Sequence, residues 1–139
     1  MSSLRVLIVE DFTPFRKFIR STLGRRPDLD VICEVSDGLE AVQKAHELKP
    51  DLILLDVGLP GLNGIEAARR IRKLTTESKI IFLSQESSPD VVRAAFDLGA
   101  QGYVVKTRAS SELLAAVEAV ISEKHFVGRL QAEHSTLEA

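Results

Sequence analysis

The residues Leu52-Ile53-Leu54-Leu55-Asp56 form an apolar run that ends in a carboxylate. Such a run, without polar alternation, is typical of a parallel strand with both faces covered by helices. Residues 4–11 repeat the arrangement, because an apolar run there is followed by Glu10 and Asp11. If the two strands are neighbours in one sheet, three carboxylates meet at one edge. Their repulsion would raise the pKa of at least one of them unless a cation is present.

The ligand chemistry of this acidic group favours a hard divalent cation. Carboxylate oxygens suit Mg²⁺, above all where phosphate is handled. Any one of these acids could instead serve only to cap the helix that follows its strand. That alternative accounts less well for all three together.

The rest of the chain alternates strand-length apolar runs with segments of helical period. The predicted strands are residues 4–10, 31–35, 52–56, 80–84 and 102–105. Five strands, each followed by a helix, predict the α/β class. We therefore expect a single, doubly wound, five-stranded parallel sheet of the flavodoxin-like (βα)5 kind, with strand order 2-1-3-4-5.

Capping residues mark the starts of the predicted helices. Asp37 and Asn63 are each followed three residues later by glutamate, the capping-box spacing. Ser88 precedes a proline, and Thr13 precedes Pro14, which predicts that Ser88 and Thr13 are N-caps. The pattern weakens after residue 123. We predict one domain over residues 4–124, with a tail or the start of a linker over 125–139 that is frayed or disordered from residue 128.

Composition excludes several classes of protein. The chain has 139 residues and a net charge of −2, which favours neither a nucleic-acid-binding nor a membrane-binding surface. Its one cysteine, Cys33, lies in an apolar stretch and reads as a small core residue. No segment reaches the ~18 apolar residues of a membrane span, and no signal peptide is evident. These features predict a cytoplasmic protein.

Ligands of open α/β sheets bind at the carboxyl ends of the strands, so residues at those ends are the site candidates. Beyond the three acids, the fourth strand ends in Ser84 and the fifth is followed by Lys106. Together they suggest phosphoryl transfer, with Asp56 as the nucleophile and Lys106 balancing charge. Alone, Ser84 could be a turn residue, Lys106 a solvated strand end, and Tyr103 a half-buried aromatic.

At these positions the chain resembles the receiver domain of two-component response regulators. The matching residues are Glu10 and Asp11, residues 55–64, Ser84 and residues 102–106, in the same order and spacing. The resemblance covers about residues 4 to 124. The phrase at 102–107 is most similar to the branch that usually carries a C-terminal helix-turn-helix DNA-binding domain.

The resemblance implies a role for each residue. Asp56 would accept a phosphoryl group from a sensor histidine kinase or a phosphotransfer protein. Mg²⁺ would be held by Asp11, Asp56 and the backbone carbonyl of Gly58, with Glu10 acting through water. Lys106 would contact the phosphoryl group. The domain would be a signalling switch, not an enzyme, that assists its own phosphorylation and dephosphorylation.

Ser84 and Tyr103 would form a switch pair that responds to phosphorylation. Space vacated by Ser84 would let Tyr103 turn from an exposed to a buried rotamer. The output face would consist of the fourth helix, fifth strand and fifth helix. That face, or the first and fifth helices, could form a homodimer, with Arg93 or Arg108 at its rim. No nucleic acid or membrane contact is expected of this domain itself.

Three residues depart from the common receiver pattern. Thr107 stands where proline usually follows the lysine, which leaves open whether the Lys106–Thr107 bond is cis. Gln85 is larger than usual and could narrow access to the site, and Gly58 places no side chain over it.

Three other functions are compatible with the same fold class. A flavodoxin-like cofactor module would need a Ser/Thr/Gly-rich loop after the first strand, where Glu10 and Asp11 stand. An aspartyl-phosphate phosphatase would carry a second aspartate at position 58. A degenerate receiver would act only through protein contacts. The sequence leaves open whether the chain is a stand-alone receiver or part of a longer regulator.

Overall fold

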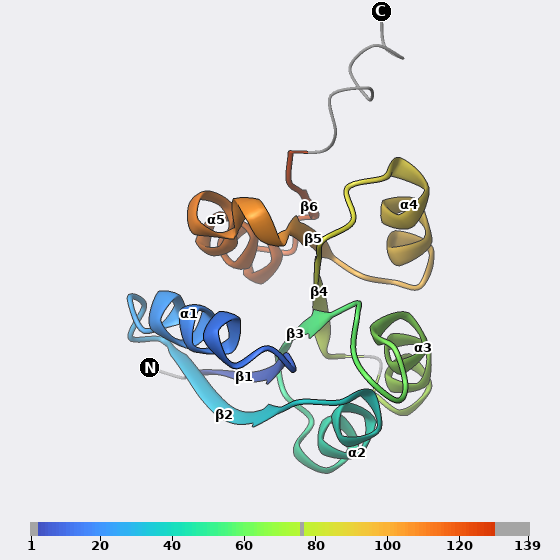
Figure 1. Cartoon of the computed structure of the whole chain (residues 1–139). Coiled ribbons are helices and arrows are strands. Elements are labelled where there is room, and N and C mark those ends of the chain that lie inside the picture. Colours follow the sequence, from blue (N-terminus) through green and yellow to red (C-terminus); the bar gives the residue numbers. More distant parts are fainter. Residues whose placement is uncertain (1–2, 76, 130–139) are drawn as a thin grey trace, which may run out of the picture.

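A computed structural model describes residues 3–75 and 77–129, which form a parallel sheet between two layers of helices (Figure 1). The strands are β1 (Leu4–Val9), β2 (Leu29–Val35), β3 (Leu52–Asp56), β4 (Lys79–Ser84), β5 (Gly102–Val105) and β6 (Phe126–Val127). The helices are α1 (Thr13–Leu23), α2 (Gly38–Leu48), α3 (Gly64–Leu74), α4 (Pro89–Asp97), the 3-10 turn η1 (Lys106–Arg108) and α5 (Ala109–Ile121). Helices α1 and α5 cover one face of the sheet, and α2, α3 and α4 cover the other (Figure 1).

The uniformly apolar strands follow from this two-sided cover. Alternate residues of β3 enter different cores: Ile53 and Leu55 face α2–α4, whereas Leu52 and Leu54 face α1 and α5. Both sets are almost fully buried. A strand buried on both faces has no position for a polar side chain until it ends. Asp56 is the residue at which β3 ends.

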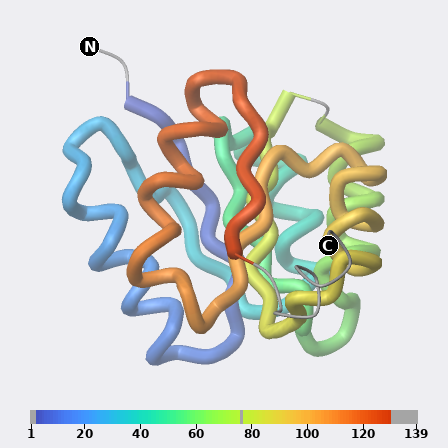
Figure 2. Tube along the Cα trace, turned by 90° about the horizontal axis from the view of Figure 1, so that it is seen from above, coloured from blue at the N-terminus to red at the C-terminus, as the bar shows by residue number. Residues whose placement is uncertain are grey.

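The predicted fold class is confirmed, with one further strand. The sheet has the order β2-β1-β3-β4-β5-β6, so the predicted order is extended by a short sixth strand at the edge. In β6, Phe126 pairs with Gly102 and Val127 with Tyr103. Figure 2 shows the segment after α5 turning back to run alongside the sheet.

The expectation of a frayed or disordered tail from residue 128 is wrong for its first two residues. The Gly128 amide donates to the Tyr103 carbonyl over 3.1 Å, and the Arg129 amide donates to Glu112 Oε2 over 3.0 Å. The rest of the predicted tail, residues 130–139, lies outside the described residues. The domain boundary at residue 124 stays a prediction.

Three of the four predicted helix caps are confirmed. The side chains of Asp37, Asn63 and Ser88 each accept a backbone hydrogen bond at the start of α2, α3 and α4. The prediction for Thr13 is wrong, because the N-cap of α1 is Phe12, without a side-chain cap. Pro14 has no backbone N–H, so the start of α1 has one unpaired donor fewer. The helix can therefore begin without a capping side chain.

The amino ends of the central strands are tied together. Asp51 Oδ2 accepts the Arg5 amide over 2.8 Å, the Asp51 amide donates to the Arg5 carbonyl over 2.9 Å, and the Asp51 carbonyl accepts the Lys79 amide over 2.9 Å. These bonds join β1, β3 and β4 at the edge opposite the acidic residues. Within the described residues, no helix combines the length and hydropathy needed to cross a bilayer.

Candidate functional site

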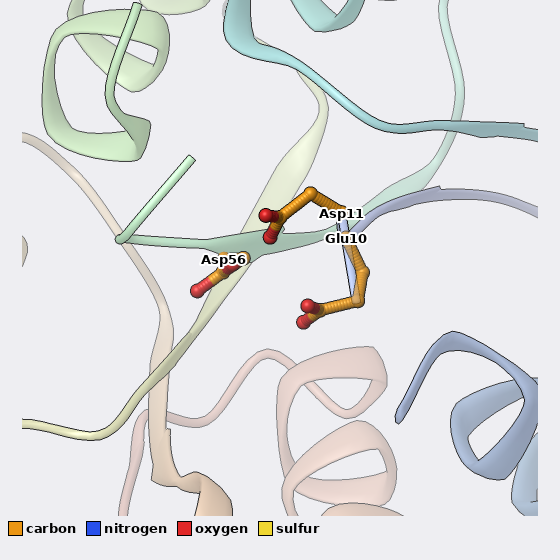
Figure 3. Close-up of side chains that lie close together, drawn as sticks. All are labelled: Glu10, Asp11 and Asp56. Atoms are coloured by element: carbon orange, nitrogen blue, oxygen red, sulfur yellow. The ribbon is translucent and has the colours of Figure 1, made fainter. Parts of the chain in front are cut away.

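The three acidic residues predicted to converge do so. Strands β1 and β3 are neighbours in parallel register, with Val9 beside Leu55, so their carboxyl ends lie together. Glu10, Asp11 and Asp56 each bring a carboxylate oxygen within 4.8 Å of the others. Figure 3 shows the three side chains lying close together at this end of the sheet. Glu10 and Asp56 are buried, whereas Asp11 is exposed to solvent.

Asp56 is held firmly at the end of its strand. The residue is 3% exposed, and Oδ1 accepts the Gly58 amide over 3.1 Å. The chain then turns sharply, because the Gly64 amide donates to the Val57 carbonyl over 2.9 Å. A Cβ on Gly64 would lie 2.1 Å from the Asp56 carbonyl oxygen, so only glycine fits there. The backbone of this loop therefore fixes the position of the Asp56 carboxylate.

Among the described residues, Lys106 is the lysine whose ammonium group is recorded in contact with these acids. Its Nζ lies 2.9 Å from Glu10 Oε1 and 3.2 Å from Asp56 Oδ1. The Lys106 side chain is only 13% exposed. It reaches the site from the first residue of η1, directly after β5. No peptide bond in residues 3–75 or 77–129 is cis, so the Lys106–Thr107 bond is trans.

Burial and charge shift the proton affinities of this cluster. Burial raises the pKa of Glu10 above its ordinary value, although Lys106 and the Phe12 amide oppose the shift. Burial also raises the pKa of Asp56, against the Gly58 amide and Lys106. Burial alone would lower the pKa of Lys106, but its contacts with Glu10 and Asp56 outweigh that effect and raise it. The site therefore combines one cationic ammonium with two buried carboxyl groups whose ionisation is costly.

Ser84 and Tyr103 lie beside this cluster on β4 and β5. Ser84 is buried at the end of β4, and its Oγ accepts the Glu86 amide over 2.9 Å. Tyr103 is fully buried, and its hydroxyl donates to the Glu86 carbonyl over 3.0 Å. The structure therefore has Tyr103 in the inward arrangement. Burial raises the pKa of Tyr103, with Ser84 opposing and Glu86 reinforcing the shift.

A pocket of about 230 Å³ opens beside Asp56. It is lined by Asp56, Val57, Gly58, Ser84, Gln85 and Glu86. Gly58 and Gln85 are exposed, so both can meet an incoming molecule. The pocket is large enough for a small anion next to the Asp56 carboxylate.

The donor set fits a hard divalent cation. Three carboxylates gather their oxygens, one of them on the solvent-exposed Asp11. Mg²⁺ keeps several water ligands and takes one or two carboxylates from a protein, so an exposed acid beside two buried ones suits it. The part of the chain that the structure describes places no histidine or cysteine in this group. The chemistry favours Mg²⁺ over softer metals.

One contact at the site was not predicted from the sequence. The Lys106 ammonium lies 5.0 Å from the centre of the Phe15 ring. Phe15 occupies an apolar position in the helical period of α1, which by itself indicates only a core residue. Helical period identifies the face on which a side chain lies, but not which charged group comes from a distant strand to meet it.

Comparisons with known proteins agree with the geometry. Residues 6–118 match the model of the response regulator receiver domain. The chain is 38% identical over 116 residues to the transcriptional regulatory protein LiaR of Bacillus subtilis, which covers 84% of this chain and 55% of LiaR. It is 36% identical over 114 residues to the response regulator protein VraR of Staphylococcus saprophyticus, with 82% and 54% covered. The chain thus spans about half the length of these relatives.

A solved structure gives the same picture in three dimensions. A two-component response regulator of the LuxR family from an Aurantimonas species superposes with a TM-score of 0.85 at 34% identity. The match covers 90% of this chain and 89% of that one.

Proposed function

Because the chain belongs to the response regulator receiver domain family, we propose that Asp56 is its phosphoacceptor. The donor would be a phosphohistidine on a sensor kinase or a phosphotransfer protein. The observation that carries the proposal is the position of Asp56. Its carboxylate stands at the end of β3, 3.2 Å from the Lys106 ammonium, beside a pocket of about 230 Å³.

The transfer needs an ionised Asp56. One carboxylate oxygen attacks phosphorus, the P–N bond to the donor imidazole breaks, and the electron pair leaves with the imidazole. Burial makes ionisation of Asp56 costly, and the nearby Lys106 ammonium offsets part of that cost. The same ammonium can donate to a phosphoryl oxygen once the group has arrived. Ser84, at the pocket wall, can donate to another.

Asp11, Asp56 and the Gly58 carbonyl would hold Mg²⁺, with Glu10 acting through water. The gathered carboxylates support this assignment. When bound, the ion would neutralise charge on the phosphoryl oxygens. The chain's own contribution is to hold two acids rigidly and leave Asp11 open to solvent.

Phosphorylation would alter the face made of α4, β5 and α5. A phosphoryl group adds about −1.5 to −2 charge units, and it would draw Ser84 and Lys106 toward it. The change would shift the populations of two existing states. The buried Tyr103 of this structure would be one of those two arrangements.

The switch would regulate partners in the cytoplasm. The α4–β5–α5 face, or α1 with α5, would support a homodimer, with the exposed Arg93 or Arg108 at its rim. LiaR is named a transcriptional regulatory protein, which supports transcription as the process controlled. A separate part of a longer regulator, not this domain, would then contact DNA.

Phosphate labelling tests the central proposal. The chain is incubated with Mg²⁺ and phosphoramidate, or with a phosphorylated kinase domain, and its intact mass is followed. We expect one phosphoryl group that is stable in acid and labile in base. Asp56→Asn should abolish it, whereas Asp97→Asn, at an exposed site on α4, should not. Full labelling of Asp56→Asn would refute the assignment and leave a module that acts only through protein contacts.

A further inference from the structure

The Lys106 ammonium is held on three sides, and the third is aromatic. Glu10 and Asp56 accept from Nζ over 2.9 and 3.2 Å. The ring of Phe15, from the first turn of α1, has its centre 5.0 Å from the same nitrogen. The aromatic contact and the two carboxylates thus come from three different parts of the chain and meet at one cation.

The ring is itself held in place by its neighbours. Phe15 stacks on Phe18 with 5.5 Å between ring centres and 27° between planes. Both rings pack against the core that α1 and α5 form with the sheet. Phe15 is half-buried, so its position is fixed while one face remains available to Lys106.

An aromatic ring face can attract this cation, whereas an aliphatic side chain of the same size cannot. The electron-rich face of the ring attracts the ammonium electrostatically and replaces water on that side. An ammonium has three N–H donors, and two of them serve Glu10 and Asp56. The ring can attract the charge without accepting a conventional hydrogen bond, so the third donor remains free for a phosphoryl oxygen.

We propose that Phe15 is a positioning residue that holds the Lys106 ammonium beside Asp56 through the face of its ring. The proposal rests on the proposed phosphoacceptor function, because it assigns Phe15 a role in that same reaction. It predicts that the rate of phosphorylation depends on the aromatic character at position 15 and not only on its apolar bulk.

Four variants distinguish attraction by the ring face from packing by apolar volume. Phe15→Leu and Phe15→Met keep apolar volume without a ring, and Phe15→Tyr keeps the ring. Phe126→Leu is the matched control, because it removes a ring that packs against the same core from β6 and not from α1. Two non-aromatic variants are included so that a folding failure in one still leaves a test; circular dichroism and thermal melting establish which are folded.

The first readout is the initial rate of labelling with phosphoramidate and Mg²⁺. We expect Phe15→Leu and Phe15→Met to slow it by about threefold to thirtyfold, the range that a partly desolvated cation–aromatic contact supports. Phe15→Tyr and Phe126→Leu should stay within about twofold of the parent. A parent-like rate in a folded Phe15→Leu or Phe15→Met overturns the proposal. So does a rate in Phe15→Tyr as low as in Phe15→Leu.

The second readout does not depend on phosphorylation. An ammonium held by fixed partners exchanges its protons slowly enough to give a ¹H–¹⁵N signal, so Lys106 should show one in the unphosphorylated chain. We expect the signal in the parent, Phe15→Tyr and Phe126→Leu, and its broadening in Phe15→Leu. If the parent is not phosphorylated, the phosphoacceptor function fails, and this signal still decides whether the ring holds Lys106. An unchanged signal in Phe15→Leu overturns the positioning role.

Discussion

Ser84 and Tyr103 hold the two backbone polar groups of one residue, Glu86. Ser84 Oγ accepts the Glu86 amide over 2.9 Å, and the Tyr103 hydroxyl donates to the Glu86 carbonyl over 3.0 Å. The loop after β4 is therefore fastened at both ends of a single residue. A movement of Ser84 should therefore move the loop, and the loop carries the Glu86 carbonyl that accepts from the Tyr103 hydroxyl.

This linkage predicts that a phosphate mimic reorganises the loop and β5 together. A beryllofluoride adduct at Asp56 should change amide hydrogen exchange across residues 85–108, because Ser84 would move to donate to the adduct and its bond to the Glu86 amide would move the loop with it. Ser84→Ala should remove most of that response while leaving exchange changes near Asp56. Exchange changes confined to the neighbourhood of Asp56 in the parent would argue against a switch through Tyr103.

Mg²⁺ should stabilise the chain through the acidic cluster. A ligand that binds only the folded state, at ten times its dissociation constant, raises the free energy of unfolding by about 1.4 kcal/mol. We expect thermal melts to show a higher Tm as Mg²⁺ is added. Asp11→Asn should remove the effect, and Asp97→Asn should preserve it. An equal rise in Asp11→Asn would place the ion elsewhere.

Asp56→Asn should stabilise the unphosphorylated chain at neutral pH. Burial raises the pKa of Asp56, so the folded state retains this proton to a higher pH than the unfolded state does. The free energy of unfolding therefore falls as pH rises from the ordinary carboxyl pKa through the raised one, and the ionised group destabilises the fold above that window. Asparagine removes this cost, so its advantage in Tm should be present at pH 7 and vanish below about pH 4.

The measurement is a series of melts of parent and Asp56→Asn between pH 4 and pH 8, without Mg²⁺. For a domain of this size, 1 kcal/mol corresponds to about 4 °C in Tm. A less stable Asp56→Asn at pH 7 would mean that the attraction to Lys106 outweighs the burial of the carboxylate.

Gly64→Ala should lower the stability of the fold and displace the Asp56 carboxylate. A Cβ there would lie 2.1 Å from the Asp56 carbonyl oxygen, so the β3–α3 loop must move. Overpacking of this kind costs about 1–3 kcal/mol, measurable by urea denaturation. Gly58→Ala is the control, since the nearest recorded atom to its Cβ would be Asp56 Oδ1 at 4.0 Å. Similar losses of stability in the two variants would contradict the close approach at Gly64.

Most of the fold could be predicted because a strand buried on both faces leaves an unmistakable apolar run. The carboxyl end of such a run is the first place where a polar side chain can stand. Asp56, Glu10 and Lys106 were found in this way. Their convergence then followed from the parallel arrangement of neighbouring strands.

Other features depend on contacts that no local pattern records. Strand β6 has two residues, and it forms because the chain after α5 returns along β5, where backbone groups supply the bonds. Phe15 has the spacing of a core residue, and its contact with Lys106 exists only after α1 and β5 have assembled. The Thr13 prediction was wrong because Pro14 supports a helix start without a capping side chain.

The wholly parallel sheet also constrains the order in which the molecule can assemble. Strand β1 lies between β2 and β3, so Val6 needs both Val31 and Leu52 before its hydrogen bonding is complete. Each pairing closes a long loop, and loop-closure entropy makes such non-local topologies slow to fold. During synthesis the apolar run at Val6–Val9 must remain unpaired on one side until β3 has been made. Within this domain β1 is the first strand to be synthesised, so it has the longest exposure to aggregation.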